Sequence, residues 1–352
     1  MNSKLQWLRN KMLSLNLQGM IISNPINIKY LTNIDAEGTL IITPKENIYI
    51  TDGRYIEQVH SILTLFDEII VYDVNDISKD DYENFFAFCE DVGFEEHYIS
   101  YATYKDYIRK YKINNFVETE YIIEKQRMIK DEDELSNLIK ACNITDECFK
   151  YILSYIKPGM TEKQIAKEIE DYYCERTDGL SFDTIVASGE NSSKPHAVPT
   201  ERKIQEKDII TIDMGCKVNG YCSDMTRTFF VGEPTQEMKR VYDLVLNNQK
   251  FALEQYKDGT STRQVTKMVE NDFKLNGYDL IHSLGHGVGL EIHEPPYISY
   301  KNDTFLKENM VVTDEPGIYV PGKFGVRIED TVQITKFGCI SLTTSEKDYI
   351  II

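Results

Sequence analysis

Ile209-Ile-Thr-Ile-Asp-Met-Gly-Cys-Lys-Val-Asn-Gly-Tyr-Cys-Ser-Asp-Met-Thr-Arg-Thr-Phe-Phe230 is the segment with the pattern of a complete β-hairpin. Two β-prone runs flank Asn219-Gly220, a dipeptide that favours the type I′ turn of a two-residue loop. With these two residues as the loop, Val218 faces Tyr221, and the same count continues along both strands. The segment therefore predicts a hairpin of defined register.

This register decides which side chains share a face of the hairpin. It places Gly215 opposite Asp224, and Asp213 opposite Thr226. Because strand side chains alternate between faces, Asp213 and Asp224 lie on one face as diagonal neighbours, with Cα atoms about 7–8 Å apart. Their carboxylates can then reach one cation or a pair of cations. The alternative is two solvated carboxylates on an open sheet face.

The composition excludes several classes of function. The chain has 352 residues, enough for two domains or one large domain with a sizeable core. Lys and Arg number 39 against 57 Asp and Glu, a formal net charge of -18. This charge repels phosphate backbones, so we expect no nucleic-acid partner. No apolar run approaches the ~20 residues of a membrane span, so we expect no membrane association.

Cysteine usage and the first residues predict a cytoplasmic protein. The seven cysteines are odd in number and include no Cys-x-x-Cys, which is typical of reduced thiols rather than of a disulfide framework. The hairpin register puts Cys216 and Cys222 on opposite faces, so we expect both to be unpaired. Residues 1–15 have the pattern of an amphipathic helix and lack the apolar core of a signal peptide.

The first third of the chain alternates helix and strand signals, which predicts an α/β domain over residues 1–123. The expected strands cover residues 19–23, 38–43, 47–51 and 68–72, and a helix is expected around residues 80–91. This part carries only His60 and His97 and no ligand-like cluster. Its expected role is structural, as an oligomer contact or as a wall over a site elsewhere.

The second predicted domain, residues 124–352, contains an internal repeat. A charged passage at 124–134 opens a predicted helix that reaches about residue 156. Residues 157–170 then resemble residues 257–270 at a constant offset of 100, and both segments start with a capping-box pattern. A second long helix is expected from 236 to about 256. The repeat predicts two similar α/β halves with a site at their seam; the alternative is a chance similarity of two amphipathic helices.

Histidines gather in this second domain. His196 follows Lys194-Pro in a loop-like stretch, and three more lie in His282-Ser-Leu-Gly-His286-Gly-Val-Gly-Leu-Glu-Ile-His293. The spacing of His282 and His286 would suit a helical metal pair, but the surrounding glycines argue against a helix. Glycines let backbone approach closely, so this cluster is a candidate site.

Two acidic residues lie in strongly β-prone runs. Glu315 follows Val311-Val-Thr-Asp, and Glu329 lies in Gly325-Val-Arg-Ile-Glu-Asp-Thr-Val-Gln-Ile334. A carboxylate buried without a partner costs free energy, so each is expected to have a cation nearby. For Glu329, the alternative to a metal is a salt bridge with Arg327 on the same strand face.

In this order and context, Asp213, Asp224, His286, Glu315 and Glu329 resemble the dinuclear metallopeptidases of the pita-bread fold. The resemblance covers residues 125–352 densely. The chain is similar to the proline-directed branch of this family in particular. Three passages carry this similarity: residues 181–189 with 194–196, residues 285–294, and residues 315–319. The first third resembles that branch's creatinase-type domain more loosely, through residues 27–32 and 51–55, and departs from it at Asn33-Ile-Asp-Ala36.

The resemblance implies a role for each site residue. Asp213 would bind one metal, His286 and Glu315 the other, and Asp224 and Glu329 would bridge both. The ions would be two divalent cations, Mn²⁺ first, with Co²⁺, Zn²⁺ or Fe²⁺ as options, holding a bridging hydroxide. By the same resemblance, the further catalytic residues are those that hold substrate, move protons or orient a ligand: His196, His293, His282 and Arg327.

The function implied by the resemblance is hydrolysis of the bond between an N-terminal residue and proline. Both an Xaa-Pro aminopeptidase and an Xaa-Pro dipeptidase fit, acting on proline-containing peptides or dipeptides, and a homodimer is expected. Two alternatives remain open at this point. One is a peptidase-like peptide-binding module that has lost catalysis, and the other is a creatinase-type amidinohydrolase, which shares the fold but works without the metal ligands.

Overall fold

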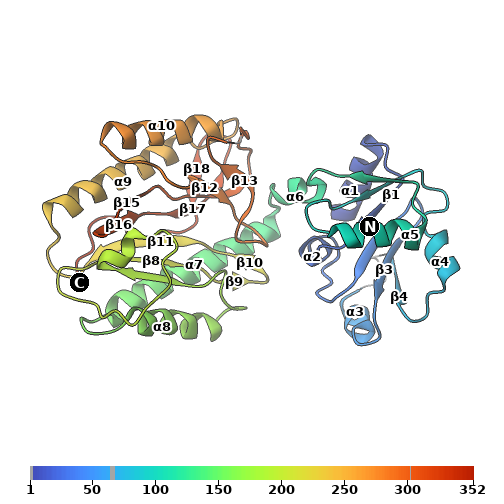
Figure 1. Ribbon diagram of the computed structural model, residues 1–352, viewed down its shortest axis with the longest axis horizontal. Helices are drawn as coiled ribbons and strands as arrows, with labels where there is room; N and C mark the ends of the chain where they lie inside the picture. Colours follow the sequence, from blue (N-terminus) through green and yellow to red (C-terminus); the bar gives the residue numbers. More distant parts are fainter. Residues whose placement is uncertain (1–2, 64–67, 302) are drawn as a thin grey trace. The chain divides into compact units, whose positions relative to one another are not determined.

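The computed structural model describes residues 3–63, 68–301 and 303–352. They form two compact units, Met1–Arg127 and Met128–Ile352, which are the blue to blue-green part and the green to red part in Figure 1. The sequence-based limits of 1–123 and 124–352 place this division slightly earlier. Each unit is described by itself.

The first unit is an α/β unit built on one mixed sheet. Among its described residues six strands pair in the order β4-β3-β2-β1-β5-β6. The strands are β1 Gly19–Ile22, β2 Thr39–Ile42, β3 Asn47–Thr51, β4 Ile69–Asp73, β5 Asp91–Phe94 and β6 Asn115–Glu118. The helices are α1 Ser3–Ser14, α2 Pro25–Thr32, α3 Ile56–Ile62, α4 Lys79–Asn84, α5 Tyr101–Tyr111 and α6 Ile122–Arg127. Strands β1 and β3 are buried at every residue, on both faces of the sheet.

The four strands expected in this unit are confirmed as β1 to β4. The helix expected around residues 80–91 is too long, because α4 ends at Asn84 and Asp91 already begins β5. Tyr82, Phe86 and Cys89 are all buried at helical spacing. Past Asn84, however, the backbone closes tight turns with bonds to the third residue back, such as Cys89 N–H to Phe86 O at 2.9 Å. The apolar periodicity therefore outlasts the α-helix itself.

The second unit contains the rest of the regular structure. Its helices are α7 Glu132–Tyr155, α8 Glu162–Cys174, α9 Gln236–Gln255 and α10 Thr262–Leu275, with a 3₁₀ turn at Gly189–Ser193. Its strands are β7 Ile185–Ser188, β8 Ile209–Met214, β9 Lys217–Val218, β10 Tyr221–Cys222, β11 Met225–Phe230, β12 Gly285–Gly287, β13 Glu294–Ile298, β14 Val311–Asp314, β15 Gly317–Val320, β16 Phe324–Arg327, β17 Asp330–Ile334 and β18 Cys339–Ser341.

The predicted hairpin is confirmed with its register. Val218 pairs with Tyr221, and Asp213 pairs with Thr226 in the antiparallel ladder of β8 and β11. Asn219 and Gly220 have φ values of 51° and 82°, as both central positions of a type I′ turn require. The hairpin belongs to a three-stranded sheet with the order β11-β8-β7.

The repeat predicted at an offset of 100 is confirmed in the backbone bonding of the two halves. Gly159 N–H donates to Ile204 O, and Gly259 N–H donates to Leu306 O, each at 2.8 Å. Each of these turns leads into a capped helix, α8 or α10. The strand order β7-β8-β11 in the first half corresponds to β12-β14-β17 in the second. The second domain therefore consists of two pseudo-symmetric α/β halves.

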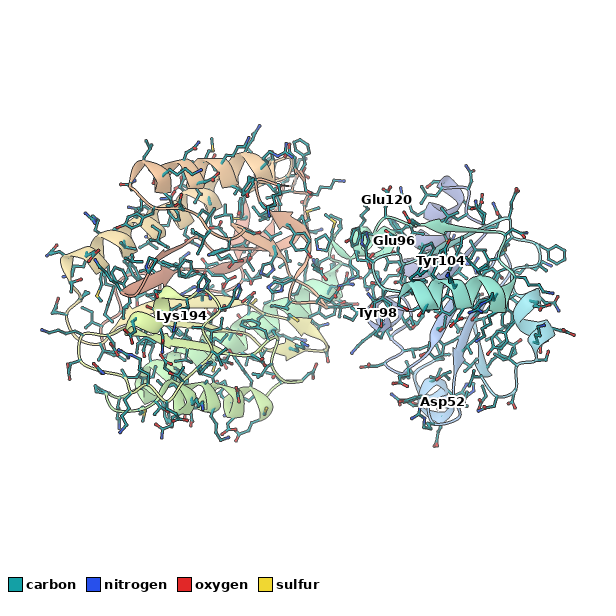
Figure 2. The ribbon with its side chains drawn as sticks, viewed as in Figure 1. Asp52, Glu96, Tyr98, Tyr104, Glu120 and Lys194 are labelled. Atoms are coloured by element: carbon teal, nitrogen blue, oxygen red, sulfur yellow. The ribbon has the colours of Figure 1, made fainter. Side chains whose placement is uncertain are left out.

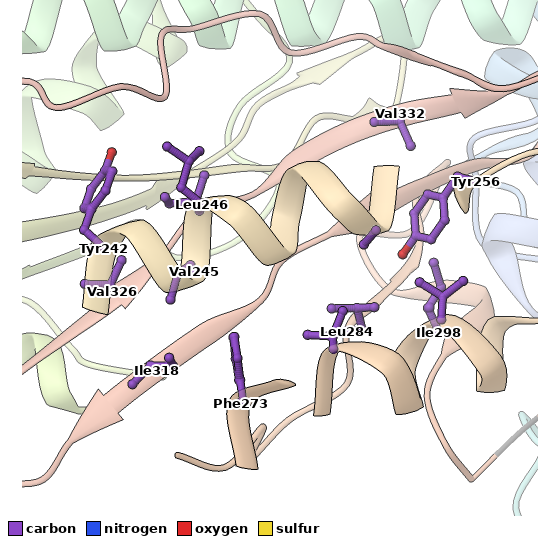
Figure 3. Packing of buried hydrophobic residues seen from close by; sticks show 14 of the residues in the cluster. Tyr242, Val245, Leu246, Tyr256, Phe273, Leu284, Ile298, Ile318, Val326 and Val332 are labelled. Carbon is purple, nitrogen blue, oxygen red and sulfur yellow. The ribbon is translucent and has the colours of Figure 1, made fainter. Parts of the chain in front are cut away.

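Two large hydrophobic cores lie between the helices and the strands of the second unit. Helices α9 and α10 lie on one side of the strands, and α7 and α8 lie on the other (Figure 1). In the core under α9 and α10, Val245 and Phe273 pack towards the strand residues Ile318 and Val326 (Figure 3). The second core joins α7 and α8 to β7, β8 and β11. Strands from both halves are thus held between two helical layers.

The single helix predicted from the charged passage at 124–134 is wrong, because α6 ends at Arg127 and α7 begins at Glu132. The break occurs because Asp131 and Glu134 form a reciprocal capping box that starts a new helix. Lys130 N–H, just before the cap, donates to Asn309 O at 3.0 Å instead of bonding within a helix.

All seven cysteines are free, and Cys216 and Cys222 are both buried, as expected. None of the helices in the described residues is both long and apolar enough to cross a membrane.

We predict that Gly259→Ala destabilises the second unit through backbone strain alone. Gly259 has φ +84° and nothing within 4 Å of an added Cβ, and Gly338 is equally open but has an ordinary φ. A left-handed conformation costs an L-residue about 1 kcal/mol, which should lower the thermal midpoint by about 2–4 °C. Gly338→Ala is the matched control and should stay near the wild-type midpoint. Equal midpoints for the two variants would contradict the strain argument.

Candidate metal centre

The residues predicted as a site meet at one cavity of about 520 Å³ in the second unit. Every one of the nine predicted site residues lines it, together with apolar side chains such as Phe182, Ile292 and Tyr297. The nine are Asp213, Asp224, His286, Glu315, Glu329, His196, His282, His293 and Arg327. Residues more than 130 positions apart in the chain are thus gathered by the fold.

The acidic residues come from equivalent places in the two halves. In the first half, Asp213 lies in β8 and Asp224 lies just before β11. In the second half, Glu315 follows β14 and Glu329 lies just before β17. Because β8 corresponds to β14 and β11 to β17, each half contributes one carboxylate from each of two neighbouring strands. The seam between the halves is where the four carboxylates converge.

His286 supplies an imidazole nitrogen to this group of carboxylates. It lies in β12 and is 6% exposed, so the predicted absence of a helical His282–His286 pair is confirmed. Its Nδ1–H donates to Gly287 O at 3.1 Å, which leaves Nε2 as the unprotonated nitrogen. Nε2 lies 3.5 Å from Asp224 Oδ2 and 3.5 Å from Glu315 Oε1. The tautomer is therefore the one that a metal ligand requires.

Burial and mutual repulsion work against the negative charge of this cluster. Burial, then Glu329 and Asp213, raise the pKa of Asp224 well above its usual range. Burial, then Glu315 and Asp213, do the same to the pKa of Glu329. Burial also raises the pKa of Glu315 to about 8, against the opposing effect of Arg327. Such carboxylates are stable in the ionised form only beside additional positive charge.

Arg327 forms its ion pair with Asp213 instead of with Glu329, which was the alternative drawn from the sequence. Its Nη2 lies 2.7 Å from Asp213 Oδ2. Its Nε donates to Thr226 Oγ1 at 3.0 Å, and the same hydroxyl donates to Glu329 Oε2 at 2.7 Å. Thr226 thus connects the guanidinium to Glu329, and Arg327 fixes the orientation of two acidic side chains at once.

The residues present fit a divalent metal centre. One carboxylate oxygen each of Asp224 and Glu329 and a ring nitrogen of His286 all lie within 4.8 Å of one another. Within the described part of the chain, Asp213 Oδ1 is buried and has no hydrogen-bond donor, so an acceptor at the cavity lacks a partner. Four carboxylates and one imidazole are the oxygen-rich ligand set that hard divalent cations prefer.

The three remaining histidines differ in how they are held. His282 Nδ1–H donates to Ser283 O at 2.8 Å, so its Nε2 accepts from the Tyr319 hydroxyl at 3.0 Å. Within the described residues, the rings of His196 and His293 have no hydrogen-bond partner. Burial lowers the pKa of His282 to about 4 and also lowers the pKa of His293. His196 and His293 are therefore open to a bound molecule, whereas His282 is engaged with Tyr319.

Two residues of the site were missed by sequence reasoning. Tyr319 accepts from Arg327 Nη1 at 2.8 Å and so links this guanidinium to His282. Thr226 joins Arg327 to Glu329. The hairpin register already placed Thr226 opposite Asp213, so a signal for it was present in the sequence. Tyr319 gave no such signal, because its contact depends on how β15 and β16 pair.

Known families match both parts of the chain. Residues 136–336 match the family described as Metallopeptidase family M24, and residues 4–129 match the Creatinase/Prolidase N-terminal domain. These matches confirm the predicted fold class, a creatinase-type α/β domain followed by a pita-bread domain. The predicted resemblance to this family is confirmed as well.

Relatives and solved structures cover nearly the whole chain. The Xaa-Pro dipeptidase of Pyrococcus furiosus is 35% identical over 347 residues, 95% of each chain. The structure of the Xaa-Pro dipeptidase from Bacillus anthracis is 35% identical, with a TM-score of 0.93 over 99% of each chain. The X-Pro aminopeptidase structure from Thermotoga maritima is 32% identical, with a TM-score of 0.87 over 97% of this chain and 100% of that one.

We predict that Thr226→Val weakens divalent-cation binding without unfolding the chain. The substitution keeps the side-chain volume but removes the hydroxyl that joins Arg327 to Glu329, and losing a group that orients a ligand typically costs about 10- to 100-fold in metal affinity. Titration calorimetry with Mn²⁺ measures the change. Thr211→Val removes a buried hydroxyl from the same sheet whose partner among the described residues is the Thr228 hydroxyl, so this variant should bind Mn²⁺ like the wild type. Equal affinities for both variants would contradict a role for Thr226.

Proposed function

The chain belongs to metallopeptidase family M24 and is an enzyme, and we propose that it hydrolyses the peptide bond between an N-terminal residue and proline. The observation that carries this proposal is the convergence of five potential ligands of the family's type on one cavity. Proline has no amide hydrogen and a fixed φ, so this bond needs a dedicated site. The names of the relatives, Xaa-Pro dipeptidase and X-Pro aminopeptidase, support the same substrate class.

We propose that the centre holds two divalent cations, with Mn²⁺ as first choice and Co²⁺, Zn²⁺ or Fe²⁺ as options. Asp213 would hold one ion, His286 and Glu315 the other, and Asp224 and Glu329 would bridge them. When bound, the cations lower the pKa of a water molecule and polarise the scissile carbonyl.

The chain's own residues would prepare the site for this chemistry. Arg327 holds Asp213 Oδ2, which leaves Oδ1 facing the ligand position. The bond from His286 Nδ1–H to Gly287 O keeps Nε2 unprotonated. The ring nitrogens of His196 and His293, which have no hydrogen-bond partner within the described residues, would bind substrate and pass a proton to the departing proline nitrogen. Apolar side chains around them would exclude bulk water.

Two other functions receive less support. A creatinase-type amidinohydrolase works without the metal ligands, and all five are present here. A binding module that has lost catalysis would have no need to gather Asp224, His286 and Glu329 within 4.8 Å of one another. Cytoplasmic location and a homodimer remain predictions from composition and family resemblance.

We predict that Asp224→Asn and Glu329→Gln each abolish turnover of Xaa-Pro peptides and uptake of Mn²⁺ while the fold is retained. Both changes preserve shape and remove one negative charge from the ligand set. Elemental analysis after dialysis measures the metal, near two equivalents per chain in the wild type. Asp183→Asn is the matched control, because this exposed carboxylate lines the same cavity outside the five and its loss should leave metal content unchanged. Full activity in either ligand variant would remove the site assignment.

We also predict that peptides longer than two residues are the better substrates. Among the described residues lining the cavity, Arg327 is the one Arg or Lys, and four of its N–H contacts are already made inside the protein. The free carboxylate of a dipeptide would therefore meet Asp183 without a compensating cation.

Steady-state kinetics should then give a kcat/KM for Xaa-Pro-Yaa at least about fivefold above that for Xaa-Pro, the effect of roughly 1 kcal/mol. Asp183→Asn should raise the dipeptide value more than the tripeptide value. A dipeptide preference that Asp183→Asn leaves unchanged would contradict this expectation and favour a strict dipeptidase.

A further inference from the structure

A loop between β7 and β8 forms one wall of the cavity. Pro195, His196, Ala197, Val198 and Pro199 all line the cavity, and Lys194, labelled in Figure 2, marks the loop just before them. His196 and Val198 are exposed, so little packing of their own fixes their positions. The position of His196 therefore depends on how the ends of this loop are held.

A single buried carboxylate holds both ends of the loop. Glu162, the first residue of α8, is 0% exposed. Its Oε1 accepts from Ser188 N–H and from Ser188 Oγ, each at 2.7 Å. Its Oε2 accepts from Thr200 N–H at 3.0 Å and from Thr200 Oγ1 at 2.6 Å. Asn191 Nδ2 adds contacts of 3.2 and 3.1 Å to the two oxygens. Five donors thus converge on a carboxylate that would be costly to bury without them.

Two further contacts to this loop come from the second half of the domain. Gly325 N–H donates to Ser192 Oγ at 2.9 Å, and Arg327 Nη1 donates to Pro195 O at 3.1 Å. The middle of the loop is therefore tied to the residue that orients Asp213, and Glu162 fixes its two ends. These contacts together determine where His196 stands relative to the candidate metal ligands.

In the other half of the domain, the residue equivalent to Glu162 has no carboxylate. Thr262 occupies the place of Glu162 at the offset of 100, as the first residue of α10. Its hydroxyl accepts from Thr304 N–H at 3.1 Å, and neither Thr262 nor Thr304 lines the cavity. Both helices also bond the neighbouring segment through their first N–H, Glu162 to Arg202 O and Thr262 to Thr304 O. The carboxylate clamp is thus an addition specific to the half that carries His196.

We propose that Glu162 is a positioning residue that holds the loop 189–199 and thereby places His196 beside the substrate. The kinetic part of this inference rests on the proposed function. In Glu162→Gln, the amide nitrogen must replace one oxygen, so a donor faces the N–H of either Ser188 or Thr200. One end of the loop then loses its bonds to this side chain, whereas none of the five candidate metal ligands is touched.

The first test is hydrogen exchange on metal-free chains, which requires no activity. Glu162→Gln should speed exchange of the amides of residues 188–200. Thr262→Val, the matched control, should leave the exchange of residues 188–200 at the wild-type rate. Unchanged exchange in the loop of Glu162→Gln would overturn the proposal, whatever the enzyme's substrate.

The second test is a double-mutant cycle with Mn²⁺-loaded chains and an Xaa-Pro peptide. A displacement of about 1 Å can cost on the order of 100-fold, so Glu162→Gln should lower kcat/KM by about 10- to 100-fold with wild-type metal content. In a His196→Ala background the same change should cost less than about twofold, because the loss acts through His196. Thr262→Val should keep kcat/KM within about twofold of the wild-type value.

An equal cost of Glu162→Gln in both backgrounds would overturn the positioning role and leave a purely structural one. If Glu162→Gln does not fold, Thr200→Val can replace it in the cycle. This variant removes one donor to Glu162 Oε2 and should give the same pattern, with kcat/KM lowered about 3- to 10-fold. A wild-type chain that is inactive on all Xaa-Pro peptides would overturn the proposed function. The hydrogen-exchange comparison would then decide by itself whether Glu162 holds the loop.

Discussion

Negative charge buried at the seam of the second domain is the constraint on which the rest of the structure depends. Burial raises the pKa of Asp224, Glu315 and Glu329, and the nearby charge of Asp213 raises each of these pKa values further. His286 approaches them as a neutral ring. A cluster of this kind is stable in the ionised form when cations are present and costs free energy when they are absent. We therefore regard cation binding as the property that the surrounding fold has been built to support.

The repeated architecture of the second domain brings these carboxylates together. Two halves with matching turns and strand orders each deliver two carboxylates to the seam. Arg327 supplies the fixed positive charge, pairing with Asp213 and reaching Glu329 through the Thr226 hydroxyl. The same guanidinium contacts the Tyr319 hydroxyl and the carbonyl of Pro195. The orientation of Asp213 and the loop that lines the cavity are therefore connected through one side chain, and Glu162 bonds both ends of that loop.

Much of this could be predicted from the sequence, and the limits have physical causes. The Asn219-Gly220 turn determined the register that puts Asp213 opposite Thr226, because two-residue loops leave no freedom of pairing. The repeat predicted the two halves because capping and apolar spacing are local signals. The break before Glu132 was missed. A run of charged residues is compatible with a continuous helix, and the sequence alone did not indicate that Asp131 caps a new one. Tyr319 and Glu162 were missed because their roles depend on contacts between distant segments.

The most direct test of the central claim is anomalous diffraction from crystals of the wild-type chain grown with Mn²⁺. Two-metal sites of this chemistry hold their ions about 3.5–4 Å apart. The account predicts two anomalous peaks at that separation, bounded by Asp213, Asp224, His286, Glu315 and Glu329. A cavity without peaks under saturating Mn²⁺, or peaks away from these side chains, would contradict it.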